Sequence, residues 1–176
     1  MEIKRIQQEH AMTAIYVTHD QEECFSISDR VAIMNDGLIE QLAKPEEIYS
    51  SPQTKFVAKF VGFENFFKGE IKDSSGKYHF ISEKGGYETP ILDQTIIQRK
   101  TAIAAFRPNG FEILSSDQKD QSLIPGLIRV QTYLGKGYRY LIDTELGELV
   151  VDHTENKFSI NTQVFLKPLP EMMVLL

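Results

Sequence analysis

A histidine stands between an apolar run and an acidic segment near the beginning of the sequence. The run TAIYV at residues 13–17 has the β-branched and aromatic composition of a strand buried on both faces, and His19 follows shortly after it. Asp20 then begins a segment typical of a helix start. Functional side chains of α/β proteins commonly lie at such strand ends, so His19 is a candidate functional residue. An ordinary exposed loop histidine is the alternative, and both interpretations stay open at this point.

Two glutamates beside the histidine are candidates for general bases. Glu22 and Glu23 lie in the first turn of the predicted helix, where carboxylates stabilise the helix N-terminus. Asp20 and Glu23 also have the spacing of a capping box, with Asp20 as the N-cap and Glu23 as the reciprocal acceptor. Capping therefore accounts for these carboxylates more simply than catalysis does.

The cysteine and the histidines do not form a metal-binding pattern. Cys24 is the single cysteine, and beside Phe25 it is better explained as a small buried apolar residue than as a nucleophile. The four histidines have no metal-ligand spacing with one another or with that cysteine: His10, His19, His79 and His153. No metal site is predicted.

A second candidate is the stretch YLGKGYRY at residues 133–140, which interleaves aromatic and basic side chains. It contains Tyr133, Tyr138, Tyr140, Lys136 and Arg139. On an OB-like barrel this arrangement predicts a stacking platform for an oligonucleotide. A glycine-bent hairpin whose tyrosines pack across strands is the alternative, and a regulatory small-ligand or oxyanion site lies between the two. The net charge of −6 favours the hairpin, because binding of a phosphate backbone depends on accumulated Lys and Arg.

The composition is that of a soluble globular protein. Of the 176 residues, 41% are hydrophobic and 25% are charged, and no stretch approaches the ~20 apolar residues of a membrane span. The first ten residues, MEIKRIQQEH, lack the apolar core of a signal peptide, and one cysteine cannot form an intrachain disulfide. We therefore expect a cytoplasmic protein with no general affinity for nucleic acid.

The sequence before residue 62 contains helical and hairpin patterns. Residues 2–11 predict a short amphipathic helix. An Asp-Gly turn between two apolar runs within residues 30–43 predicts a β-hairpin. Pro45 predicts a helix start, and residues 53–62 predict a helix with one apolar face that stops at its terminal glycine.

Beyond residue 65, short β-prone runs separated by turns replace the helical patterns. This texture predicts a small barrel or sandwich. The motif GEI at 69–71 recurs as GLI at 126–128, and AAFRPNGFEIL at 104–114 is echoed by VFLKPLPEMMVLL at 164–176. We infer two copies of one β unit, joined by the polar stretch at 115–122.

Two basic residues take matching places in this internal alignment. Arg107 and Lys167 each precede a proline. We interpret them as paired structural features of the repeat and not as site residues.

The segment at residues 15–62 resembles the end of the nucleotide-binding domain of ATP-binding cassette (ABC) transporters. The match runs from the histidine through SDR, MNDG and PEEIY, and it is densest in importer ATPases for ferric iron, polyamines, sulfate and maltose. The β-rich remainder, through FRPNGFEIL and YLGKGYRYLID, resembles the transport-associated OB-like (TOBE) regulatory region of the same importers. The resemblance implies an α+β chain. Residues 1–62 would be a short α/β remnant of the nucleotide-binding domain, and residues 63–176 an all-β OB-like barrel of two TOBE-type half repeats.

The resemblance gives His19 a role only in a full-length parent protein. There it would be the switch histidine that contacts the γ-phosphate of ATP, which is plausible because phosphoryl transfer is catalysed mainly by positioning and electrostatics. The Walker A loop, the signature motif and the Walker B strand of the family do not occur in the 176 residues. We expect no cofactor and no ATPase activity for this chain alone, and Mg-ATP as the cofactor of the parent.

The resemblance also implies partners and a location. The chain would be the regulatory and dimerisation portion of an importer ATPase whose parent couples ATP hydrolysis to solute uptake. Expected partners are a second copy and membrane permease subunits at the inner face of the cell membrane. Residues 1 to about 45 would either be covered by the second copy or be poorly ordered. The alternative is an OB-like oligonucleotide- or anion-binding protein with an unrelated helical accessory at its N-terminus.

Overall fold

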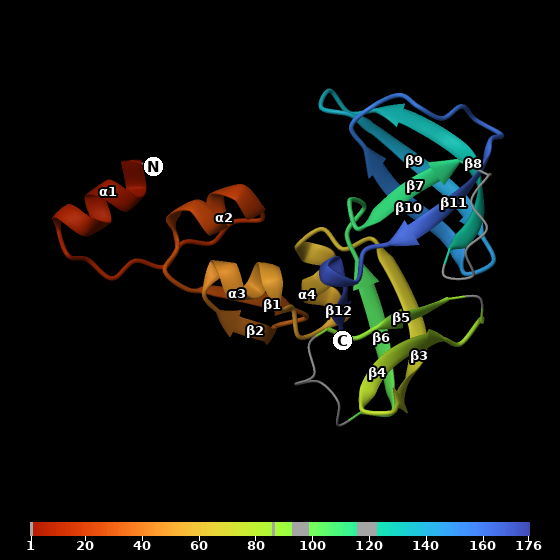
Figure 1. The fold of residues 1–176 in the computed structure, drawn as a ribbon. Helices are drawn as coiled ribbons and strands as arrows, with labels where there is room; N and C mark the ends of the chain where they lie inside the picture. Colours follow the sequence, from red (N-terminus) through yellow and green to blue (C-terminus); the bar gives the residue numbers. More distant parts are fainter. Residues whose placement is uncertain (1, 86, 93–98, 116–122) are drawn as a thin grey trace. The chain divides into compact units, whose positions relative to one another are not determined.

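The computed structural model describes residues 2–85, 87–92, 99–115 and 123–176 (Figure 1). The chain divides into two compact units, Met1–Gly62 and Phe63–Leu176. Among the described residues, no helix has both the length and the apolar composition needed to cross a membrane.

Two short helices open the first unit. Helix α1 (Glu2–Glu9) confirms the helix predicted within residues 2–11, and it ends before Ala11, whose φ of 49° is left-handed. Helix α2 (Gln21–Ile27) begins at the predicted N-cap, because the Asp20 carboxylate accepts a hydrogen bond from the Glu23 N–H at 2.9 Å.

The predicted capping box is only half formed. The Glu23 carboxylate accepts from the hydroxyls of Tyr16 and Thr18, each at 3.1 Å, and does not return to the Asp20 N–H. That N–H donates instead to the Thr18 hydroxyl at 3.0 Å. Glu23 is thus held by the segment that precedes the helix, which excludes the reciprocal bond expected from the spacing.

The predicted buried strand at residues 13–17 does not form. These residues belong to none of the three sheets of the described chain, and Ile15 and Val17 are 94% and 90% exposed. A strand is stable only when a neighbour pairs with its backbone donors and acceptors, and no described strand lies beside this segment. Residues 13–17 have a β-prone composition, but the prediction that they form a buried strand was wrong for this chain.

A hairpin follows, as predicted. Strands β1 (Val31–Asn35) and β2 (Leu38–Ala43) pair antiparallel, and the turn residues Asp36 and Gly37 have φ of 48° and 79°. Positive φ at both central residues is the requirement that the Asp-Gly pair meets.

Two helices complete the first unit and confirm the predicted helix positions. Helix α3 (Pro45–Ser50) begins with its proline, and helix α4 (Lys55–Phe60) is capped by Thr54, whose hydroxyl accepts from the Val57 N–H at 3.2 Å. Both helices contact β2. The chain leaves α4 through Gly62 with φ of 86°, which is the stop that the sequence predicted.

The second unit consists of two five-stranded antiparallel sheets (Figure 1). One sheet has the order β12-β6-β3-β4-β5 and the other β10-β9-β8-β11-β7. The strands are β3 (Asn65–Ser74), β4 (Lys77–Ser82), β5 (Glu88–Pro90), β6 (Thr101–Phe106), β7 (Phe111–Ser115), β8 (Ile124–Tyr133), β9 (Tyr138–Thr144), β10 (Gly147–His153), β11 (Gln163–Pro168) and β12 (Val174–Leu175). A short 3-10 helix, η2 (Pro170–Met172), precedes the last of them.

The two sheets are two copies of one topology that exchange a strand. Strands β3 to β7 correspond in order to β8 to β12, so the two sheets have the same arrangement. The fifth strand of each copy, however, pairs with the fourth strand of the other: β7 with β11, and β12 with β6. Figure 1 shows the exchange in its colours, with green β7 beside blue β11 and dark blue β12 beside green β6. The repeat inferred from the sequence is confirmed. Of its joining stretch at 115–122, Ser115 belongs to β7, and residues 116–122 lie outside the described residues.

The strand register confirms one half of the internal alignment. Gly69 pairs with Ser82 on β4, and Gly126 takes the same place opposite Thr144 on β9. The motifs GEI and GLI are therefore structural equivalents.

The register corrects the other half of the alignment by two residues. Ala104 pairs with Phe67 on β3, and its counterpart opposite Ile124 on β8 is Leu166, not Val164. The prediction that Arg107 and Lys167 are equivalent was therefore wrong. The counterpart of Arg107 is Leu169.

The turns after β6 and β11, the fourth strands of the two copies, explain the two-residue error in the alignment. The Gly110 N–H donates to the Arg107 carbonyl and the Met172 N–H to the Leu169 carbonyl, each at 2.9 Å, so the two turns match. The segment LKPLP offers two prolines, and the sequence alone favoured the first of them. The structure uses Pro170 where the first copy uses Pro108.

The core of the second unit draws on both sheets. Aromatic rings of Phe67, Phe106 and Phe111 pack with centroids 5.1–6.3 Å apart, and Tyr140 is fully buried in the same cluster. Because the exchanged strand β7 supplies Phe111, each copy completes the other's core.

A buried amide closes part of a sheet edge. Asn65 is 2% exposed, and its Nδ2 donates to the Val150 carbonyl at 2.8 Å while its Oδ1 accepts from the Val150 N–H at 2.8 Å. Val150 lies on β10, the edge strand of its sheet. One side chain thus makes the two bonds that a paired strand residue would make.

Candidate functional site

His19 lies on the surface, in the bend that leads into α2, and its side chain is exposed. No hydrogen bond or ion pair of its ring is found in the part of the chain that the structure describes. Glu22 is exposed as well, and Glu23 is engaged by two hydroxyls. The described residues therefore form no catalytic constellation around His19.

Cys24 does not have the surroundings of a nucleophile. It is half-buried on α2, and this burial raises the pKa of its thiol, an effect that a hydrogen bond involving Ser28 partly offsets. A raised pKa lowers the thiolate fraction at neutral pH. Cys24 was predicted to be a small buried apolar residue, and the structure shows it only half-buried.

The stretch at residues 133–140 forms the end of β8, a glycine turn and the start of β9. The rings of Tyr133 and Tyr138 pack across the strands with centroids 5.2 Å apart, and Tyr140 is fully buried. Arg139 is held by both oxygens of Asp152, at 2.8 and 3.0 Å, and by Glu64 at 3.0 Å. The hairpin interpretation is confirmed. Tyr140 and Arg139 are not available as a stacking ring and a phosphate-neutralising cation, because the ring is buried and the guanidinium is already paired.

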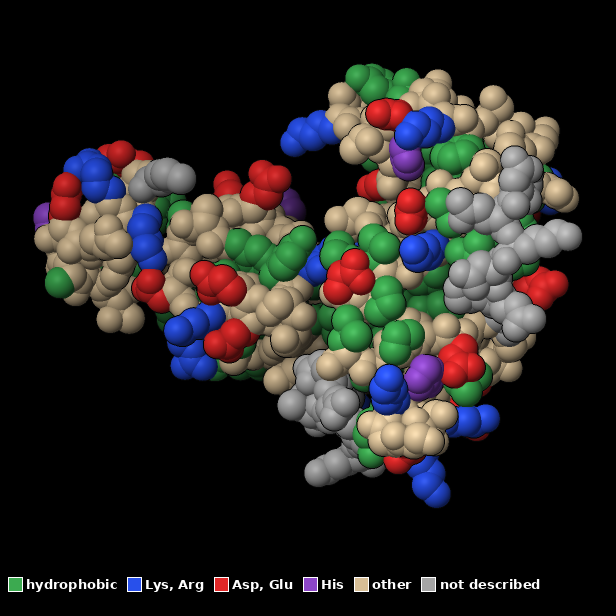
Figure 2. Space-filling model, viewed as in Figure 1, with side chains coloured by type: hydrophobic (Ala, Val, Ile, Leu, Met, Phe, Trp, Pro, Cys, Tyr) green, Lys and Arg blue, Asp and Glu red, His purple; other side chains and the backbone are tan. Residues whose placement is uncertain are grey.

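The distribution of charge agrees with this conclusion. On the face drawn in Figure 2, acidic and basic side chains are interspersed, and no continuous basic stripe crosses the described residues. Within the described chain, no group of three or more His, Cys, Asp or Glu side chains gathers in a way that could hold a metal ion.

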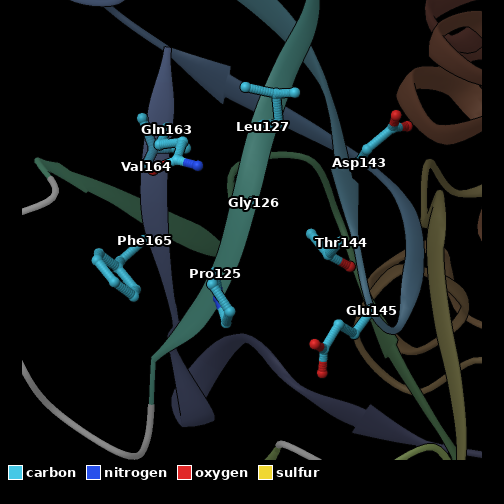
Figure 3. A pocket seen from close by; sticks show the side chains of 9 residues that line it. All are labelled: Pro125, Gly126, Leu127, Asp143, Thr144, Glu145, Gln163, Val164 and Phe165. Carbon is cyan, nitrogen blue, oxygen red and sulfur yellow. The ribbon is translucent and has the colours of Figure 1, made fainter. Parts of the chain in front are cut away.

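The second unit has a hollow of about 510 Å³ on the sheet that contains β8 (Figure 3). It is lined from β9 and the following turn on one side of β8, by Asp143, Thr144 and Glu145, and from β11 on the other, by Gln163, Val164 and Phe165. Asp143 is paired with Arg129 at 2.6 Å. The carboxylate of Glu145 and the ring of Phe165 are the hollow's remaining charged and aromatic groups.

A second cavity, here called the hairpin cleft, lies at the β8–β9 turn. It measures about 180 Å³ and is lined by Asn109, Leu134, Lys136, Gly137, Tyr138, Asp152, His153 and Thr154. Three chain segments meet there, the turn after β6, the β8–β9 turn and the end of β10. The sequence pointed to Lys136 and Tyr138, but not to Asn109, His153 or Thr154, since nothing in their local pattern signals that these segments meet.

Comparison with known proteins gives the same relatives for both units. The spermidine/putrescine import ATP-binding protein PotA of Borrelia garinii is 34% identical over 168 residues, which are 95% of this chain and 46% of that protein. The protein of that name from Acidothermus cellulolyticus is 34% identical over 89% of this chain and 41% of its own length. In the one from Clostridium novyi the identity is 30%, over 97% and 47%. The chain thus spans less than half the length of these relatives and matches their C-terminal region. No family model matches the sequence.

A solved structure supports the fold of the second unit. The cytoplasmic molybdate-binding protein ModG, with molybdate bound, superposes with a TM-score of 0.51 at 10% identity, covering 64% of this chain and 94% of that one. At this identity the likeness concerns the fold alone. It confirms the predicted OB-like, TOBE-type architecture.

Proposed function

Because the chain belongs to the family of ATP-binding proteins of ABC importers and matches their C-terminal region, we propose that it is the regulatory and dimerisation portion of such an ATPase. The observation that carries the proposal is the similarity over 95% of the chain, which extends through both units. The strand-exchanged β unit is of the type expected for the regulatory region.

The activity belongs to a full-length parent in this proposal. The parent binds Mg-ATP, hydrolyses it and couples the hydrolysis to solute uptake, together with membrane permease subunits at the cytoplasmic face. The names of the relatives specify spermidine and putrescine, which makes polyamines the proposed class of solute. The chain alone has no ATPase activity, since its sequence lacks the phosphate loop and the magnesium-binding carboxylate of the family.

His19 is the proposed switch histidine of that parent. Its place before α2, its exposure and the absence of a bond to its ring among the described residues leave it available for a γ-phosphate supplied by the rest of the nucleotide-binding domain. An imidazole there can donate to a phosphate oxygen as charge redistributes in the transition state.

The rival function, an OB-like binding protein with an unrelated helical accessory, has less support. Two of its five predicted platform residues are engaged elsewhere, because Tyr140 is buried and Arg139 is paired with Asp152. Relatives that match both units also argue against an unrelated N-terminal segment.

A chimera tests the proposal. Residues 2–62 replace the corresponding segment of the Clostridium novyi relative, and His19→Ala is then introduced. We expect turnover to fall by about 100-fold with little change in Mg-ATP affinity, because the contact is made mainly in the transition state. His10→Ala, another exposed histidine in the same segment, is the matched control and should keep full turnover. Unchanged turnover in the His19→Ala chimera would remove the role assigned to this residue.

A further inference from the structure

The hairpin cleft has the size of a site for a small molecule. Its volume is about 180 Å³, many times the ~10–15 Å³ that a cavity needs to hold one water molecule. The surface of the cleft is almost wholly apolar, and its lining includes Leu134 and Tyr138 together with polar residues from three separate segments. An apolar wall with a few convergent polar groups is the usual composition of a ligand site.

Lys136 brings a positive charge to the cleft. The turn that carries it is closed by a hydrogen bond from the Leu134 N–H to the Gly137 carbonyl at 2.9 Å, and Gly135 takes a φ of 81°. No ion pair of Lys136 is found among the residues that the structure describes. Its ammonium group is therefore available to a ligand.

His153 lines the cleft, and one of its ring nitrogens contacts the backbone of Glu155. Its Nδ1 lies 3.0 Å from the Glu155 N–H and 3.0 Å from the Glu155 carbonyl oxygen. When Nδ1 accepts from that N–H, the ring proton resides on Nε2; when Nδ1 donates to that carbonyl oxygen, the neutral ring has its proton on Nδ1. The ring packs edge-on against Phe158 with centroids 5.9 Å apart, which fixes its orientation. The tautomer in which Nδ1 accepts leaves Nε2–H as a donor for a ligand.

Asp152, the one acidic residue that lines the cleft, is already paired with Arg139. Both oxygens of Asp152 accept from Arg139, at 2.8 and 3.0 Å, and Arg139 also pairs with Glu64. The Asp152 N–H donates to the Pro108 carbonyl at 2.9 Å, which holds the turn carrying Asn109 against β10. The amide of Asn109 and the hydroxyl of Thr154 add two further groups that can donate.

We propose that the hairpin cleft binds a small organic anion with a carboxylate or phosphate group. The charged group is held by the Lys136 ammonium and the Nε2–H of His153, and the apolar body of the ligand lies against Leu134 and Tyr138. Donors to an anion form charge-assisted hydrogen bonds, which are stronger than neutral ones. The proposal goes beyond the importer role and does not depend on it.

Backbone-amide NMR titration of the whole chain tests the site. The probes are inorganic phosphate, benzoate and phenyl phosphate at low salt, which separate the charged group from the apolar body. We expect saturable shifts at the amides of residues 134–138 and 152–154, with phenyl phosphate binding most tightly. Lys136→Gln should weaken that binding at least about tenfold, as for loss of a hydrogen bond to a charged group.

Two further variants keep the result interpretable. Lys72→Gln, which changes an exposed lysine on β3, is the matched control and should leave the affinity unchanged. His153→Phe keeps an aromatic ring against Phe158 but removes the donor, so it should also weaken binding. No saturable shift at millimolar probe, shifts confined to other residues, or equal affinity in Lys136→Gln would each overturn the proposal. Binding of spermidine at the same amides, with no anion bound, would overturn it as well.

Discussion

Residues 13–17 and the apolar part of β8 are similar sequences with opposite outcomes. Ile15 is 94% exposed in a segment without strand structure, whereas Ile128 is fully buried in a strand between two neighbours. Both segments have the β-branched composition that favours strands. The difference shows that a β-prone composition is not sufficient for a strand, because the strand also needs a neighbouring strand for its backbone hydrogen bonds.

The two units differ in where along the sequence each strand finds the strand that pairs with it. In the first unit β1 pairs with β2, the next strand along the chain, across a two-residue turn. In the second unit β6 and β11 obtain partners from the other copy of the repeat through the exchanged strands β12 and β7. Local pairing thus needs only a good turn, while the β unit depends on contacts between residues distant in the sequence.

The largest expected effect compares the two isoleucines directly. Ile128→Ala should lower the free energy of unfolding of the second unit by about 4 kcal/mol, because it removes a fully buried side chain from the core. Ile15→Ala should change stability by less than about 0.5 kcal/mol, as expected at an exposed position. Urea unfolding followed by tyrosine fluorescence measures both. A cost for Ile15→Ala close to that of Ile128→Ala would mean that residues 13–17 are covered in solution, for instance by a second copy.

A smaller effect should distinguish the two copies of the repeat. A Cβ on Gly69 would clash with the Ile81 carbonyl oxygen and the Phe80 ring, whereas on Gly126 it would lie 2.6 Å from a methyl group of Ile142 and 3.2 Å from the Asp143 carbonyl oxygen. A backbone atom cannot move aside as a side chain can. We therefore expect Gly69→Ala to cost about 3 kcal/mol and Gly126→Ala about 1 kcal/mol in the same unfolding experiment. Equal costs would show that the two copies tolerate crowding alike.

The smallest of the three effects concerns the sheet edge. Asn65→Ala removes both hydrogen-bond partners of the Val150 backbone and should cost about 2 kcal/mol. Hydrogen exchange of the Val150 amide should also accelerate. Asn35→Ala, which removes a side-chain bond to Glu40 on the hairpin of the first unit, is the control and should leave that amide unchanged. Persistent protection of the Val150 amide in Asn65→Ala would mean that another group closes this edge.

Local features of the fold could be predicted from the sequence. The N-cap Asp20, the Asp36-Gly37 turn, the helix start at Pro45 and the stop at Gly62 each act through backbone geometry within a few residues. The existence of two β copies was also visible, because GEI at 69–71 recurs as GLI at 126–128, and the two glycines take the same place in the strand register.

Long-range features could not be predicted. The exchange of β7 and β12 depends on pairing between the two copies, which no local pattern encodes, and the choice between two nearby prolines misplaced Lys167 opposite Arg107. The prediction of a strand at residues 13–17 was wrong for a related reason. The composition of this segment could not show that no strand of the described chain pairs with it. The hairpin cleft was missed in part because Asn109, Lys136 and His153 meet only in three dimensions.

The exchanged strand β12 also sets an order for folding during synthesis. Ala104 and Ala105 on β6 pair with Leu175 and Val174, which the ribosome adds about 70 residues later. At ~5–20 residues per second, that delay lasts several seconds. Throughout this interval one edge of β6 lacks its neighbour, and the first copy of the repeat is present without its closing strand. The nascent chain therefore passes through a state in which an almost complete sheet offers an open edge to other polypeptides, and a chaperone that binds such edges would act in that interval.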